Sequence, residues 1–125
     1  MSRAAVFKDE IQEGNVHLVA VYLEIKNGCI VLLSEGEDQL GTLAVAIPPS
    51  PQMTTPSLSS VLMGDRNVTI ARALAERLAA KVNKIGLVSI YLKTINEAEA
   101  APILLRLFEK VTQEKPIAGQ ESVQI

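Results

Sequence analysis

The segment VHLVAVYLEIKNGCIVLL, residues 16–33, carries the clearest structural signal in the chain. Two runs rich in Val, Leu and Ile flank Asn27-Gly28, a pair typical of the two-residue turn that joins antiparallel strands. The segment therefore predicts a β-hairpin with strands over residues 16–25 and 29–33. A type I′ turn at this place requires a positive φ at both Asn27 and Gly28.

Outside the hairpin, the first half of the chain predicts three more strands. Short apolar runs bounded by Gly, Pro or Asn residues indicate strands over residues 4–11, 42–47 and 57–63. Residues 48–57 are rich in proline, so we expect them to form a loop.

The second half predicts two helices around a sixth strand over residues 87–92. Apolar residues recur with the helical period after Asp65 or Asn67, either of which is a suitable N-cap, and again after Asn96. We expect one α+β domain over residues 1–114 and a flexible C-terminal tail over residues 115–125.

Composition excludes several functional classes. The chain has 125 residues with a formal net charge of −2, 48% hydrophobic residues, 3% aromatic residues, one Cys and one His. A charge this close to zero gives no attraction for nucleic acid or for an anionic membrane. One Cys cannot form an internal disulfide, and residues 1–9 carry charges too early for a signal peptide. We therefore expect a cytoplasmic protein that binds neither nucleic acid nor membrane.

The strands are apolar on both faces, which is the feature with the strongest functional consequence. A sheet with one wet face has strands that alternate between apolar and polar residues, whereas strands apolar on both sides belong to a sheet covered twice. Six strands at ~4.8 Å spacing span about 29 Å, and two helices of ~10 Å diameter cover about 20 Å. The two helices therefore cover most of one face only, and the second face is expected to pack against another chain in a homodimer or a paralogue heterodimer.

The sequence also suggests how the two faces are divided. Because Tyr is enriched at interfaces, we assign the side chains Leu18, Tyr22, Leu87 and Tyr91 to the dimer face. The opposite side chains, Val19, Val21, Val88 and Ile90, are then expected beneath the helices.

Few residues indicate catalytic chemistry. His17 has no second His with which to bind a metal, and Cys29 has no basic neighbour in sequence to lower its pKa, so structural roles are favoured for both. We predict no catalytic, cofactor-binding or metal-binding residues and no cofactor. Four basic residues of the first helix form a solvated surface or a docking surface for an acidic protein: Arg72, Arg77, Lys81 and Lys84.

Several segments in collinear order resemble the small proteasome assembly chaperones, in particular the family of proteasome assembly chaperone four and its partner, chaperone three. The segments are VHL at 16–18, LAVAI at 43–47, SSVLMGD at 59–65 and LAERLAAKVNK at 74–84. The resemblance covers roughly residues 7–114, and the helix followed by Asn83-Lys84 is its most specific part.

The resemblance implies a fold of six antiparallel strands and two helices, dimers formed through the sheets, and no enzymatic activity. It also implies a role in assembling proteasome α-subunits into the core-particle ring, and a homodimeric relative such as an archaeal homologue fits a chain of balanced charge. Two alternatives stay open, a dimeric scaffold of roadblock type and an α+β module that binds a small ligand.

Overall fold

The structure of the chain, a computed structural model, describes residues 3–49 and 58–113. The predicted tail over residues 115–125 and most of the predicted loop over residues 48–57 lie outside these ranges. Within them the elements are β1 (Ala5–Glu13), β2 (Val16–Ile25), β3 (Gly28–Glu35), β4 (Thr42–Ile47), β5 (Leu58–Met63), α1 (Val68–Val82), β6 (Ile85–Tyr91) and α2 (Glu97–Gln113). The predicted α+β class with six strands and two helices is confirmed.

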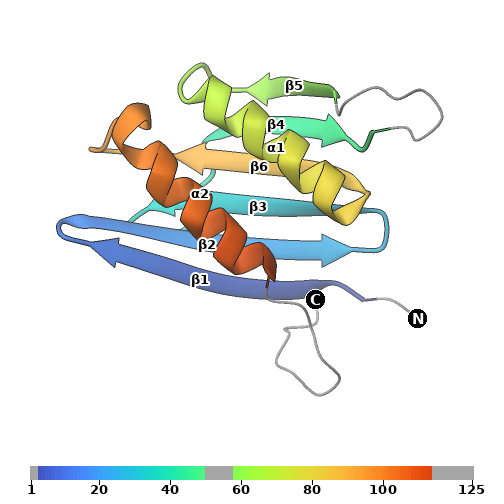
Figure 1. Cartoon of the computed structure of the whole chain (residues 1–125), viewed down its shortest axis with the longest axis horizontal. Coiled ribbons are helices and arrows are strands. Elements are labelled where there is room, and N and C mark those ends of the chain that lie inside the picture. Colours follow the sequence, from blue (N-terminus) through green and yellow to red (C-terminus); the bar gives the residue numbers. More distant parts are fainter. Residues whose placement is uncertain (1–2, 50–57, 114–125) are drawn as a thin grey trace.

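The six strands of the described residues form one mixed sheet in the order β1-β2-β3-β6-β4-β5 (Figure 1). The β3–β6 pair is parallel, and the other four pairs are antiparallel. The prediction of a mainly antiparallel sheet is confirmed, while the fully antiparallel sheet that the resemblance implied is not. The exception arises because α1 carries the chain back across the sheet, so that β6 enters between β3 and β4.

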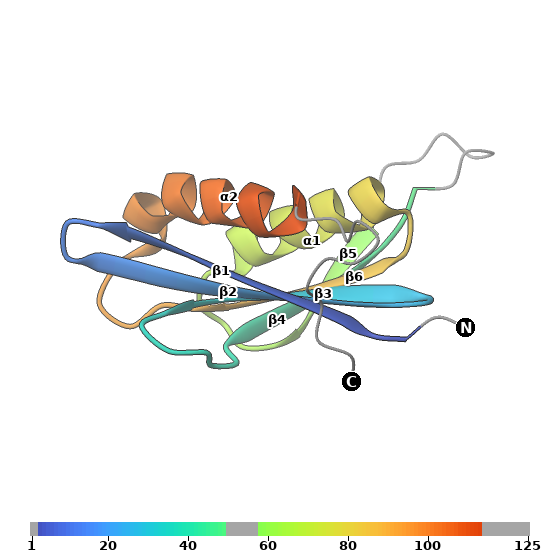
Figure 2. The same ribbon diagram turned by 90° about the horizontal axis from the view of Figure 1, so that it is seen from below.

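Both helices lie on the same side of the sheet, and within residues 3–49 and 58–113 the other side carries no helix (Figure 2). Helix α1 packs on β4 and β6, and α2 packs on β1 and β2. Close packing of α1 on β4 follows from small side chains on both elements, because alanines leave room for the helix backbone to approach the sheet. These buried alanines are Ala71, Ala75 and Ala79 on the helix and Ala44 and Ala46 on the strand.

The β2–β3 hairpin forms as predicted, but its turn does not. Ile25 pairs with Gly28, so the loop residues are Lys26 and Asn27, and neither Asn27 nor Gly28 has a positive φ. The type I′ prediction is therefore wrong. Gly28 has a different role, since a Cβ at this position would lie 3.3 Å from the carbonyl oxygen of Ile85 on the neighbouring β6.

The first turns of the two helices are capped differently, α2 by a residue next to it in sequence and α1 by a residue of the other helix. Asn96 caps α2 as predicted, because its Oδ1 accepts a hydrogen bond from the Glu99 N–H at 2.8 Å while its Nδ2 donates to Glu99. Asn67 stands at the N-cap position of α1, but its side chain makes no capping hydrogen bond. The carboxylate of Glu97 accepts the N–H of Ile70 in the first turn of α1 instead, at 3.0 Å. The first residue of α2 thus ties the two helix starts together.

Candidate protein–protein interface

The side of the sheet without helices, which we call the open face, is built from rows of aliphatic side chains. Strand register aligns Leu23, Ile30, Leu87 and Val45 across β2, β3, β6 and β4. The next row contains Val21, Leu32, Ser89 and Leu43. All of these side chains except the buried Ser89 are partly exposed. A contiguous apolar surface of this kind is characteristic of a protein interaction site.

Four large aliphatic side chains are exposed together at one end of the open face. Ile25 pairs with Gly28 and Gly28 with Ile85, while Ile47 pairs with Leu58, so these residues lie along the same margin of the sheet. Their exposed fractions are 44% for Ile25, 41% for Ile85, 50% for Ile47 and 64% for Leu58. We call this margin the aliphatic end.

The opposite end is more polar, because the loop that joins β3 to β4 folds back against the open face; within this loop only Leu40, 56% exposed, is a large apolar residue. The Gln39 N–H donates to Ser34 Oγ at 3.2 Å, and the Gly41 N–H donates to Ser89 Oγ at 2.8 Å. These bonds explain why both serines are buried although they point toward the open face. Gly41 permits the contact, since a Cβ there would lie 2.1 Å from the carbonyl oxygen of Ile90. We call residues 36–41 the polar loop.

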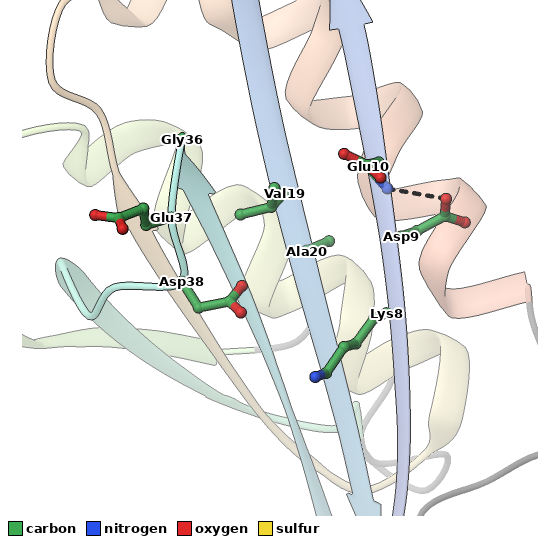
Figure 3. Close-up of a pocket in the computed structure, with 8 residues that line it drawn as sticks. All are labelled: Lys8, Asp9, Glu10, Val19, Ala20, Gly36, Glu37 and Asp38. Carbon is green, nitrogen blue, oxygen red and sulfur yellow. Dashed lines mark hydrogen bonds between the residues drawn. The ribbon is translucent and has the colours of Figure 1, made fainter.

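A hollow of about 660 Å³ lies between the polar loop and strands β1 and β2. Figure 3 shows the side chains of Lys8 and Asp38 extending toward each other across the hollow, while Glu37 points away. The hollow is wide open, and its rim is made of exposed charged side chains. It lacks the enclosed apolar walls of a small-molecule site.

Residues 3–49 and 58–113 contain neither a metal-binding cluster nor a membrane-spanning helix. Across these ranges, no group of three or more His, Cys, Asp or Glu residues is arranged to hold a metal ion. No helix there is long and apolar enough to cross a membrane.

The structure divides the four residues predicted for the dimer face between both sides of the sheet. Leu87 and Tyr91 lie on the open face, but Leu18 and Tyr22 lie beneath the helices, with exposed fractions of 0% and 3%. The prediction that the four share one face is therefore wrong, and Val19 and Val21 occupy the open face instead. Val88 and Ile90 lie beneath the helices as predicted, with exposed fractions of 0% and 1%.

Tyr22 is on the covered side because the protein satisfies its polar end internally. Its ring stacks on Phe7 with 5.8 Å between ring centroids, and its hydroxyl donates to Glu24 at 3.1 Å. The other oxygen of Glu24 accepts from Lys84 Nζ at 2.7 Å. Burial, together with the nearby Glu24 carboxylate, raises the pKa of Tyr22, so the hydroxyl stays protonated as a donor.

The four basic residues predicted as a docking surface have partners in three different places. Arg72 Nε donates to Ser59 on β5, Arg77 and Lys81 both contact Glu109 on α2, and Lys84 contacts Glu24 on β2. The structure thus brings Arg77 and Lys81 together, while Arg72 and Lys84 reach different strands. Docking of an acidic partner on this surface stays a prediction.

Sequence analysis missed the role of Glu35. Its carboxylate accepts the backbone N–H groups of Lys93, Thr94 and Ile95 at 2.7, 2.8 and 3.3 Å, and the Thr94 hydroxyl as well. Burial raises the pKa of Glu35, but the hydrogen bonds from Thr94 and its neighbours outweigh burial and lower the pKa to about 2. No sequence signal indicates this contact, because its partners lie 58 to 60 residues away.

His17 and Cys29 do not come together. His17 Nε2 lies 2.6 Å from a Glu10 oxygen near the polar loop, while Cys29 pairs with Glu24 near the other end of β2. Burial raises the pKa of the Cys29 thiol to about 11, so it is protonated at neutral pH and not nucleophilic.

Comparison with known proteins places these features in a family. The family model of proteasome assembly chaperone 4 matches residues 15–92, which is more than half of the chain. The chain is also similar to a chain in the crystal structure of a novel chaperone complex for yeast 20S proteasome assembly. That likeness has 15% sequence identity and a TM-score of 0.65, and it covers 88% of this chain and 93% of the other, which establishes a shared fold. No curated protein sequence matches the chain. On the strength of the family match, the chain belongs to the proteasome assembly chaperone 4 family.

Proposed function

We propose that this chain is a non-enzymatic chaperone that binds proteasome α-subunits and assists formation of the α-ring of the core particle. Membership of the proteasome assembly chaperone 4 family carries the proposal. The apolar open face supports it, because such a surface suits contact with protein and not with a small polar substrate. Activity in the cytoplasm is part of the same proposal.

The working form of the chaperone is a dimer in which the open face is covered by a second chain, either an identical copy or a paralogue. Aliphatic side chains exposed in rows across four strands support packing of sheet against sheet. An edge-to-edge dimer of roadblock type through β1 is less favourable, since this edge strand carries charged residues that oppose strand pairing. Leu87 and Tyr91 remain proposed members of the dimer face.

The site for the α-subunit is proposed on the outer surface of α1. Arg77 and Lys81 share one carboxylate, that of Glu109, so the pair retains positive charge for an acidic partner. Arg72, near the start of α1, and Lys84, two residues beyond its end, are proposed as the flanks of this site, although they contact β5 and β2 respectively.

The test is reconstitution of the α-ring with and without the purified chain. We expect the chain to co-purify with at least one α-subunit and to increase the yield of rings on native gels. A Leu87→Asp variant removes the dimer face and is expected to lose the effect, while Leu105→Asp on the outer side of α2, 39% exposed, serves as the control. Equal ring formation with and without the chain would contradict the proposal.

A further inference from the structure

The two edge strands of the sheet differ in how well they are protected against the addition of another strand. Strand β1 carries the charged residues Lys8, Asp9, Glu10 and Glu13. Strand β5, at the opposite edge, has the sequence LSSVLM, with no charged residue and no proline (Figure 1). Charged side chains on an edge strand oppose pairing with further strands. The β5 edge lacks this protection.

Strand β5 is also the least covered strand of the described residues. None of its residues is buried, whereas each of the other five strands has at least one buried residue. The large side chains Leu58, Leu62 and Met63 are 64%, 56% and 43% exposed. Aliphatic side chains gathered on an exposed edge provide apolar area that a further strand can cover.

The backbone of β5 offers hydrogen bonds at the same edge. Alternate residues of an antiparallel pair direct their N–H and C=O groups toward the partner strand, so the intervening residues of β5 direct theirs away from β4. No strand of the described residues pairs with this outer edge, because β5 ends the strand order. A register shift between Leu43 and Ala44 leaves Leu62 unpaired, so the regular edge comprises residues 58–61. An added strand can form about four backbone hydrogen bonds there.

The helix side of β5 carries a polar cluster of three side chains. Ser59 pairs with Ala46, which is buried beneath α1, so Ser59 points toward that helix. Its hydroxyl accepts from Arg72 Nε at 3.1 Å and donates to the carboxylate of Glu76. One positive and one negative group therefore flank the same point of the edge. A hydroxyl or amide matches both groups, because it can accept from the guanidinium and donate to the carboxylate, whereas a charged side chain is repelled by one of them.

The open side of β5 is mainly apolar. Leu58 pairs with Ile47 and Met63 with Leu43, and the small Ser60 lies between them on this side. The four large side chains are all at least partly exposed. Aliphatic pairs across neighbouring strands stabilise a sheet, so aliphatic residues of an added strand fit here. The two sides together select an extended segment in which aliphatic residues alternate with Ser, Thr, Asn or Gln.

We propose that the outer edge of β5 is a docking site for an extended, uncharged segment of a partner protein, which adds to the sheet as a seventh strand. Its aliphatic residues lie on the open side, and a hydroxyl or amide residue lies beside Ser59. Main-chain hydrogen bonds supply affinity in this mode of recognition, and alternate side chains supply specificity. The inference goes beyond the proposed function, since it concerns an edge of the sheet and not its open face.

The test titrates the full chain with the neutral peptide acetyl-Thr-Val-Thr-Val-Thr-Val-amide. Amide NMR spectra are expected to show saturable shifts centred on residues 58–63. Peptides with Glu or Lys in place of Thr are expected to bind about threefold or more weakly, because Glu76 repels the first and Arg72 the second. Three results would overturn the inference: no saturable shift of residues 58–63 at about 1 mM peptide, shifts confined to the open face, or tighter binding of a charged peptide.

Backbone pairing is tested with two N-methylated forms of the same peptide. Alternate residues of an extended strand direct their N–H groups to opposite edges, so methylation of the Thr amides blocks one edge and methylation of the Val amides blocks the other. One form is expected to bind about tenfold or more weakly and the other to keep its affinity, because only one edge of the peptide meets β5. Equal retention or equal loss of affinity in both forms would contradict strand addition.

A substitution in the chain locates the site independently. Leu58→Lys places on β5 the kind of charge that protects edge strands, and the exposure of Leu58 means that the fold is expected to survive. This variant is expected to bind the neutral peptide about tenfold more weakly, while the matched control Leu105→Lys, on the outer side of α2, changes the affinity less than about twofold. Circular dichroism confirms folding of both variants, and equal effects on binding would contradict a site on β5.

Sedimentation velocity separates a partner segment from a second copy of this chain. The Leu58→Lys variant is expected to self-associate as the wild type does. If the substitution abolishes a dimer that the wild type forms, a second copy pairs through β5 and the inference is wrong.

Discussion

The two faces of the sheet are both rich in aliphatic residues, yet they differ in how those residues are used. On the covered face, side chains such as Val31 and Leu33 are fully buried beneath two helices. On the open face, Leu32 from the same strand is partly exposed. The polar loop covers part of this face, where the Gly41 N–H donates to Ser89. Burial within one chain thus explains the covered face, whereas contact with another chain is our proposal for the open face.

The sharpest way to separate the faces is to place the same charge on each. Tyr22→Asp is expected to lower the free energy of unfolding by about 3–5 kcal/mol, because it buries an unpaired carboxylate and removes the ring that stacks on Phe7. Tyr91→Asp on the open face is expected to leave the unfolding free energy of the monomer within about 1 kcal/mol of wild type. Urea unfolding followed by circular dichroism measures both. Similar losses for the two variants would contradict the division into a covered and an open face.

Adjacent residues of β3 give a finer version of the comparison. Val31→Ala is expected to lower the unfolding free energy by about 2 kcal/mol at every protein concentration, because it creates a cavity in the core. Leu32→Ala removes a side chain from the proposed dimer contact, so its loss of stability is expected only at concentrations where the wild type is dimeric. Melting temperatures at about 1 and 100 μM distinguish the two effects. A concentration-independent loss for Leu32→Ala would show that the open face is not an interface.

The division between faces also marks the limit of what the sequence could predict. Element types and most boundaries follow from local patterns, such as the runs of β2 and the helical period after Asn67. The side of the sheet toward which Tyr22 points does not follow from local patterns. Because both sides of β2 are apolar, the alternation of residues cannot show which side faces the helices. Preference of Tyr for interfaces selected the wrong side, since Phe7 and Glu24 satisfy its ring and hydroxyl within the fold.

Contacts between segments that are distant in sequence could not be predicted either, because no local pattern indicates them. Nothing near Glu35 in sequence indicates that it binds the backbone of residues 93–95, and nothing near Gly41 indicates its contact with Ile90. The open apolar face, by contrast, could be predicted, because six strands form a sheet wider than two helices can cover on both sides. The polar end of this face could not be predicted, because it depends on where the loop of residues 36–41 folds.

Glu35 offers a smaller effect with a defined pH dependence. Glu35→Gln is expected to lower the unfolding free energy by about 1–2 kcal/mol at pH 7, a value reduced because part of the carboxylate meets solvent. The pKa of Glu35 is lowered to about 2 from 4.5, so the carboxylate's contribution is present in full above about pH 4.5 and is lost as the pH falls through 2. Urea unfolding at pH 7, 4 and 2.5 should therefore show the difference between variant and wild type shrinking. A difference independent of pH would contradict the role of the ionised carboxylate.

The outer surface of α1 provides the smallest expected effect on stability and the clearest test of its proposed docking role. Arg77, with a side chain 56% exposed, forms an ion pair with Glu109 that is open to solvent and screened by salt. Arg77→Ala is therefore expected to change the unfolding free energy by less than about 1 kcal/mol, with no loss of dimerisation. If this surface binds an acidic α-subunit, the same variant weakens that binding about fivefold or more at low salt, and the difference narrows as salt is raised. Lys26→Ala in the β2–β3 turn removes an exposed positive charge away from α1 and is the matched control. If both substitutions weaken binding equally, the effect reflects the net charge of the chain and not a contact with Arg77. That result would contradict a docking site on α1.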